Sequence, residues 1–255
     1  MEVNHEAAVL SKAAYDYFRD GLEAAQAELV EYGLDGYHFD AALSDDYSVV
    51  IERPDRTAVI SYRGTDALED VVPDIQILLG RHSPFAHRLT ALRSGTHITD
   101  RFEAADRKYQ HAAEKYTPER IAYLTGHSLG GTQAIATARR RGLVSHAFNP
   151  GSSPFVEMIH AGVCSLADCD ERPQSIYTTG TDPISFGSYL FDPATDNVVT
   201  VMPKHGGDWF SHSLSHFLPS RASRPEPTWL QPVHAVTGER RPFCEAFPAY
   251  CPPRV

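Results

Sequence analysis

The chain has 255 residues, of which 42% are hydrophobic and 22% are charged, and its formal net charge is -10. This composition is that of an ordinary globular protein and argues against a disordered, fibrous or membrane-spanning chain. One large domain is expected at this length, and so acidic a surface repels nucleic acid phosphates, which excludes nucleic acid as an expected partner.

The N-terminus lacks the basic start and apolar stretch of a signal peptide, and nowhere do 18 apolar residues run together. We therefore expect a cytoplasmic or non-classically exported protein. The four cysteines fall into two local pairs, Cys164 with Cys169 and Cys244 with Cys251. Each pair either closes a short disulfide loop or remains as thiols, and neither has the CxxC spacing of a zinc site.

Helical periodicity through the first thirty residues predicts an N-terminal helix that ends near Gly33. Two β-branched runs, 47–51 and 57–62, are joined by a turn signal and predict an antiparallel hairpin. Residues 71–79 carry an apolar stripe that fits a short amphipathic helix, and residues 100–116 form another helical pattern.

A strand at 121–125 runs into a glycine-rich turn, and a helix follows from Leu129 to Arg141, where Gly142 stops it. Further short strands are expected at 144–148, 175–178 and 198–202. Strands alternating with helices predict an α/β domain with a mostly parallel sheet and helices on both faces. The domain is assigned to residues 1–218. Residues 219–255, which hold eight of the 18 prolines, are assigned to a strap or tail.

The turn after the third expected strand reads Gly126-His127-Ser128-Leu129-Gly130, a Gly-x-Ser-x-Gly motif between a strand and a helix. In such a turn the serine takes a strained backbone conformation, and side chains at the two glycines would collide with neighbouring elements. Ser128 is then exposed above the sheet at a helix N-terminus, as a nucleophile requires. A tight turn that merely contains a serine is the alternative.

About sixty residues upstream stands Ile60-Ser61-Tyr62-Arg63-Gly64-Thr65-Asp66. With the serine motif, it resembles the RGT motif of class 3 lipases, the fungal-lipase-like branch of the α/β-hydrolases. Asp70 to Asp74 and Val144 to Gly151 resemble further segments of that family, and the likeness spans roughly residues 8–218. The resemblance implies an α/β-hydrolase fold. It also implies an oxyanion hole formed by Thr65 and the backbone N–H of Leu129, although Thr65 also fits a plain turn.

A serine nucleophile needs a histidine base, which needs a carboxylate to orient it, and α/β-hydrolases carry these in the order acid, then histidine. Gly180-Thr181-Asp182-Pro183 resembles the class 3 pattern of a catalytic Asp before Pro, so Asp182 is the predicted acid. The other candidates stand in turn-like stretches, where Asp commonly caps its own backbone: Asp170, Asp192 and Asp196.

Three histidines compete for the role of base. His212 opens a HSLxxF pattern that resembles the catalytic-histidine segment of bacterial and viral-type relatives, and it is the predicted base. His216, four residues on, is the first alternative and His205 is the second. The interval from Asp182 to His212 is shorter than in the secreted fungal lipases. A metal pair of His212 with His216 is disfavoured because HSLSH lacks the glutamate of HExxH.

The predicted function is a serine hydrolase of carboxylic esters, with lipid acyl esters favoured by the resemblance alone. No metal or cofactor is required. Residues 71–79 lie where class 3 lipases carry a lid, and would either contact a lipid surface transiently or pack permanently on the sheet. Two other readings stay open, an acyltransferase with the same triad and a non-catalytic binding or structural protein of the same fold.

Overall fold

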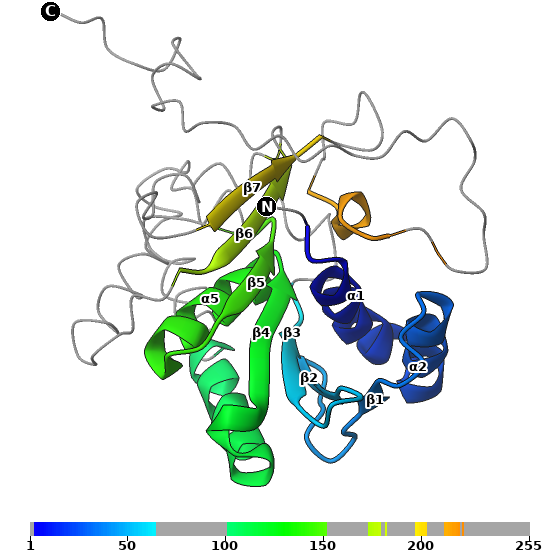
Figure 1. Cartoon of the computed structure of the whole chain (residues 1–255), viewed down its shortest axis with the longest axis vertical. Helices are drawn as coiled ribbons and strands as arrows, with labels where there is room; N and C mark the ends of the chain where they lie inside the picture. The colour runs from blue at the N-terminus through cyan, green and yellow to red at the C-terminus, as the bar shows by residue number, and fades with distance from the viewer. Residues whose placement is uncertain are drawn as a thin grey trace, which may run out of the picture.

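The computed structural model describes residues 3–64, 101–151, 173–179, 182, 197–202, 212–219 and 221. Within this part of the chain, one seven-stranded sheet forms the centre of the molecule, and its strands lie side by side in sequence order (Figure 1). The strands are β1 (His38–Phe39), β2 (Ser48–Glu52), β3 (Ala58–Tyr62), β4 (Ile121–His127), β5 (Ser145–Phe148), β6 (Ser175–Thr179) and β7 (Asn197–Val201).

The sheet combines an antiparallel edge with a parallel centre. The β1–β2 and β2–β3 pairs are antiparallel, and every pair from β3 to β7 is parallel. The carboxyl ends of β3 to β7 therefore all lie at one edge of the sheet, because parallel strands run in the same direction. Loops that follow these strands can bring residues distant in sequence to the same place.

Helices cover both faces of the sheet. Helices α1 (His5–Asp20) and α2 (Leu22–Glu31) lie on one side, and α5 (Leu129–Arg141) lies on the other (Figure 1). Residues 101–116 form a further helix whose buried side chains share a hydrophobic cluster with those of α5. The prediction of an α/β domain with a mostly parallel sheet and helices on both faces is therefore confirmed.

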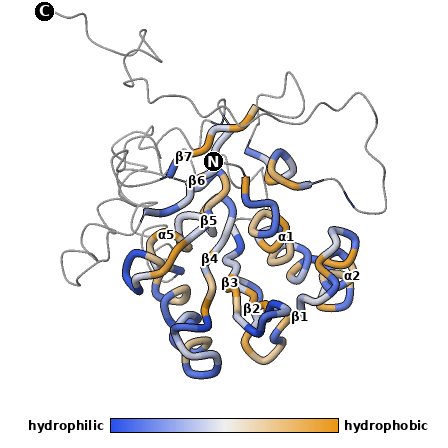
Figure 2. Tube along the Cα trace, viewed as in Figure 1, coloured by the Kyte–Doolittle hydropathy of each residue, from blue (hydrophilic) through white to orange (hydrophobic). Residues whose placement is uncertain are grey.

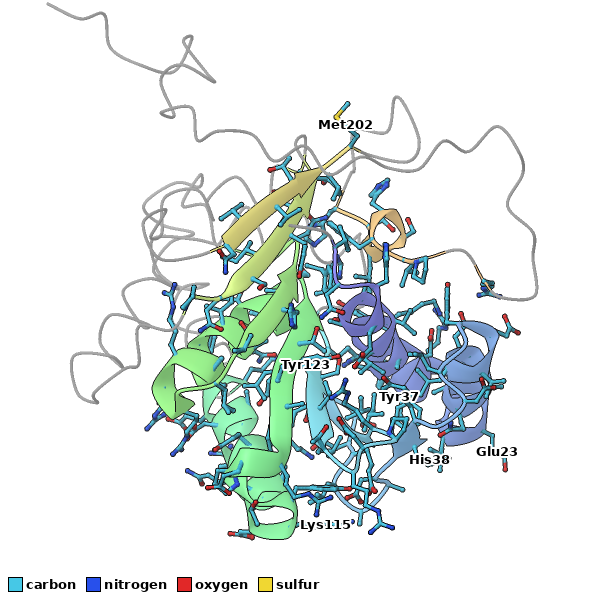
Figure 3. All side chains as sticks on the ribbon, in the orientation of Figure 1. Glu23, Tyr37, His38, Lys115, Tyr123 and Met202 are labelled. Carbon is cyan, nitrogen blue, oxygen red and sulfur yellow. The ribbon has the colours of Figure 1, made fainter. Side chains whose placement is uncertain are left out.

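Successive side chains along a strand point to opposite faces of the sheet and join two separate hydrophobic clusters, one on each face. On β4, Tyr123 joins the cluster under α1, whereas the next residue, Leu124, joins the cluster under α5. Tyr123 lies between the sheet and α1 (Figure 3), where its hydroxyl donates to the Glu6 carboxylate at 2.8 Å. Hydrophobic residues are spread over the strands and α1, whereas the arginine-rich C-terminal end of α5 is hydrophilic (Figure 2).

The N-terminal region differs from the single helix that the sequence predicted. The helical conformation is interrupted between α1 and α2 at Gly21, whose φ is 85° and ψ is 175°. Residues with a side chain rarely adopt this backbone conformation, so the glycine allows an abrupt change of chain direction here. Asn4 caps α1 by accepting a hydrogen bond from the Ala7 N–H at 3.0 Å.

Other predicted elements agree with the structure to within a residue or two. The β2–β3 hairpin is antiparallel as expected, and α5 spans the predicted residues and ends at Gly142 in the left-handed conformation. The sequence analysis missed β1, which has only two residues. None of the helices in the described ranges is long and apolar enough to cross a membrane.

Several predictions fall on residues outside the described ranges. These include the 71–79 helix, all four cysteines, and the tail apart from residues 219 and 221. The domain boundary near residue 218 therefore remains a prediction.

Candidate active site

Ser128 occupies the junction between β4, which ends at His127, and α5, which begins at Leu129. Its φ is 57° and its ψ is -130°, a conformation that costs a non-glycine residue on the order of 1–3 kcal/mol. The neighbouring chain holds Ser128 there, because its N–H donates to the Phe148 carbonyl at 3.0 Å and its carbonyl accepts from the Gly151 N–H at 3.2 Å. The strained turn expected from the motif is present, but Ser128 is buried, with 5% of its surface exposed, where the motif predicted an exposed serine.

Glycines allow three segments to meet around Ser128. A Cβ on Gly130 would strike the backbone of Tyr62, and one on Gly126 would strike the Gly130 carbonyl. A Cβ on Gly64 would lie 2.6 Å from the His127 carbonyl oxygen and 3.0 Å from Ser128 Cβ. The end of β3 therefore packs directly against the serine turn.

Asp182 and His212 form a buried hydrogen-bonded pair. His212 Nδ1 lies 2.8 Å from the Asp182 carboxylate, and the exposed fractions of the two side chains are 5% and 0%. Asp182 follows β6, where its N–H donates to the Thr179 carbonyl at 3.1 Å. Since a carboxylate only accepts, His212 Nδ1 carries the hydrogen, and the carboxylate fixes the ring orientation and tautomer. The 30-residue interval is long enough to bring the two residues together.

The alternative candidates are placed differently. His216 lies in a short 3-10 helix, η3 (Leu214–His216), and its side chain is buried. Residues Asp170, Asp192, Asp196 and His205 lie outside the described ranges. Among the described residues, no group of three or more His, Cys, Asp or Glu side chains could hold a metal ion.

His127 connects the histidine segment to the serine turn. His127 Nε2 lies 2.6 Å from the His212 backbone carbonyl, and the centroids of the two imidazole rings are 4.7 Å apart. Burial, together with the nearby His212 ring, lowers the pKa of His127 from 6.5 to about 3. His127 is therefore neutral at physiological pH, and His212 lies next to the residue that precedes Ser128.

Within the described residues, nothing donates to or accepts from His212 Nε2, Ser128 included, although this nitrogen is buried. The structure thus brings Asp182, His212 and the serine turn together without a Ser128–His212 hydrogen bond. Such bonds are often long or misaligned in the absence of substrate.

Of the two predicted oxyanion donors, the structure describes Leu129 but not Thr65. Leu129 is the first residue of α5, so its N–H has no acceptor within the helix and lies at the positive end of the helix dipole. Thr65 lies outside the described residues, one position after Gly64. Its role remains a prediction.

Two residues next to the serine were missed by sequence reasoning. His127 occupies the variable position of Gly-x-Ser-x-Gly, and Tyr15 lies in the N-terminal segment, where only a helical pattern was recognised. The structure joins them, because the Tyr15 hydroxyl lies 3.0 Å from His127 Nδ1. Nothing in the sequence signals a contact between residues 112 positions apart, and only the tertiary fold reveals it.

No protein-family model matches the chain, and no curated protein matches it. One match among solved structures is lipase II from Rhizopus niveus, with 14% sequence identity, coverage of 78% of each chain and a TM-score of 0.44. An identity this low does not transfer residue roles from that lipase to this chain.

The close approach of α5 to β3 gives a graded prediction for two adjacent glycines. Gly130→Ala should lower the free energy of unfolding by about 3 kcal/mol or more, because its Cβ would meet rigid backbone. Gly131→Ala is the matched control, since its Cβ would lie 3.0–3.4 Å from its nearest neighbours and should cost about 1 kcal/mol. Urea unfolding measures both values, and equal costs would contradict the predicted packing.

The neutral state of His127 predicts how stability depends on pH. Its pKa is lower in the folded state, so its contribution is complete above about pH 6.5 and is lost as the pH falls towards 3. One such group gives a slope of up to about 1.4 kcal/mol per pH unit in that window. His127→Gln should make the slope shallower when unfolding is measured at several pH values.

The same substitution at the exposed His38 is the control for that experiment. A wild-type slope retained in His127→Gln would show that His127 does not titrate as a buried neutral group.

Proposed function

We propose that this protein is a serine hydrolase that cleaves carboxylic esters through Ser128, His212 and Asp182. The observation that carries the proposal is the buried 2.8 Å hydrogen bond between His212 and Asp182, beside the turn that holds Ser128 in a strained conformation. A serine, a neutral imidazole and a carboxylate in this order are the groups that acyl transfer uses.

In the proposed reaction, Ser128 Oγ attacks the ester carbonyl while its proton passes to His212 Nε2. The resulting imidazolium is stabilised by the Asp182 carboxylate on the opposite ring nitrogen. Collapse of the tetrahedral intermediate breaks the ester C–O bond, and the leaving alcohol takes the proton from Nε2. Water then attacks the acyl-enzyme with His212 again as base, which releases the carboxylic acid and restores Ser128.

The negative charge that develops on the carbonyl oxygen requires fixed donors. We assign these to the Leu129 N–H and to Thr65. The position of Leu129 at the start of α5 supports the first assignment, because free N–H groups and the helix dipole both favour an anion there. The second is supported by Gly64, whose close approach to Ser128 brings the chain beside the serine just before Thr65.

A lipid acyl ester is the proposed substrate class. Its support is the resemblance of the RGT, GHSLGG and Asp-Pro segments to class 3 lipases, together with the α/β-hydrolase architecture. The 71–79 segment is the proposed contact with a lipid surface.

Ser128→Ala should abolish labelling by a fluorophosphonate probe and abolish hydrolysis of p-nitrophenyl esters. His212→Ala and Asp182→Asn should each lower kcat by about 10³- to 10⁶-fold, because each removes one member of a unit that acts together. His216→Ala is the matched control, since it removes another buried histidine of the same segment and should retain most of the activity.

The assay should include acyl chains from two to sixteen carbons, and the proposed lipid substrate predicts faster hydrolysis of the longer chains. Labelling of Ser128→Ala at the wild-type rate would refute the nucleophile. An active His212→Ala variant beside an inactive His216→Ala variant would reassign the base.

A further inference from the structure

The hydroxyl of Tyr15 on α1 lies among the segments that carry the proposed active site. The Gly64 N–H donates to it at 3.0 Å, and it lies 3.0 Å from His127 Nδ1. The Tyr15 and His127 rings meet edge to face, with centroids 5.8 Å apart. Tyr15 therefore joins α1 to the end of β3 and to the end of β4.

The direction of each hydrogen bond follows from the acceptors. The His212 carbonyl can only accept, so His127 Nε2 carries the hydrogen of that bond. His127 is neutral, so its Nδ1 has no hydrogen and accepts from the Tyr15 hydroxyl. Burial raises the pKa of Tyr15, which keeps this hydroxyl protonated. A continuous chain of donors runs from the Gly64 N–H through Tyr15 and His127 to the His212 carbonyl.

Three residues of this chain of hydrogen bonds are proposed site residues or their direct neighbours in sequence. Gly64 precedes Thr65, His127 precedes Ser128, and the carbonyl at the far end belongs to His212 itself. The three catalytic residues come from separate loops at the sheet edge, and small displacements among such groups reduce catalysis strongly.

We propose that Tyr15 and His127 form a positioning pair, which holds the oxyanion strand end, the nucleophile turn and the catalytic-histidine segment in register. The inference rests on the proposed hydrolase function. Neither side chain is assigned a contact with substrate. The pair acts through its hydrogen bonds to the backbone of Gly64 and His212, and through the peptide bond that joins His127 to Ser128.

The neutral state of His127 gives the pair a second consequence. A charged imidazole 4.7 Å from His212 would disfavour the imidazolium that His212 must form during catalysis. Protonation of His127 would also place a hydrogen on Nδ1, so the Tyr15 hydroxyl could no longer donate to this nitrogen and would have to turn its own hydrogen to another acceptor. The positioning pair can therefore lie against the proposed base without competing for its proton.

The test compares four variants by steady-state hydrolysis of a soluble p-nitrophenyl ester. Tyr15→Phe removes only the hydroxyl, His127→Leu removes both ring nitrogens, and the double variant combines these changes. His127→Gln keeps an amide donor near the place of Nε2. Tyr177→Phe is the matched control, because its hydroxyl makes a 3.1 Å bond to His146 Nδ1, another partly buried contact between a tyrosine and a histidine.

Tyr15→Phe and His127→Leu should each lower kcat by about 10- to 100-fold with KM unchanged, since misplaced catalytic groups slow the reaction without weakening ground-state binding. The double variant should be no slower than the slower single variant, because the two residues act through one chain of bonds. His127→Gln should recover at least part of the loss, and Tyr177→Phe should have wild-type kcat. Unfolding midpoints check that all variants are folded.

Nitrogen NMR of the histidine rings tests the pair without any reference to activity. Wild-type His127 should remain neutral with its hydrogen on Nε2 from pH 8 to 5, and Tyr15→Phe should lose this single tautomer. Wild-type kcat in Tyr15→Phe, or losses that multiply in the double variant, would overturn the inference while the hydrolase function stands. A wild-type protein without esterase activity or Ser128 labelling would instead refute the proposed function and, with it, a catalytic role for the pair. The NMR result would then still decide whether the chain of hydrogen bonds exists.

Discussion

The positive φ of Ser128 is the constraint on which the proposed site depends. A non-glycine residue stays in this conformation only when its surroundings hold it, and here the ends of β3, β4 and β5 do so together. The Phe148 carbonyl accepts from the Ser128 N–H, and Gly130 lies against the backbone of Tyr62. The parallel pairing places these strand ends at one edge of the sheet, so the folding energy of the sheet maintains the strained backbone conformation of Ser128.

Burial determines how charge is distributed around that turn. Asp182 and His212 are both enclosed, and the hydrogen bond between them compensates the carboxylate for its loss of water. His127 lies against the same imidazole but stays neutral, because desolvation lowers its pKa to about 3 and its two nitrogens bond to neutral groups. In the proposed reaction, proton transfer is therefore assigned to His212, whose buried Nε2 has no hydrogen-bond partner among the described residues.

Local sequence patterns predicted most of the helices and strands, but they did not predict contacts between residues that are distant in sequence. The β2–β3 hairpin, the β4 strand and α5 are each marked by nearby residues, from β-branched runs to the glycine at the end of α5. Asp182 and His212 were selected by family resemblance, and the structure places His212 Nδ1 2.8 Å from the Asp182 carboxylate. The break at Gly21 was missed because a helical pattern continues across it, and the contact of Tyr15 with His127 was missed because it depends on how α1 packs on the sheet.

The central claim is that Ser128 and His212 act on one reacting carbonyl. A crystal structure of the protein treated with a phosphonate ester, which mimics the tetrahedral intermediate, tests this claim most directly. We expect phosphorus bonded to Ser128 Oγ, with the phosphoryl oxygen accepting from the Leu129 N–H and His212 Nε2 within about 3.2 Å of Oγ or of the ester oxygen. Phosphorus bonded to another residue, or an adduct at Ser128 with His212 turned away from it, would contradict the account.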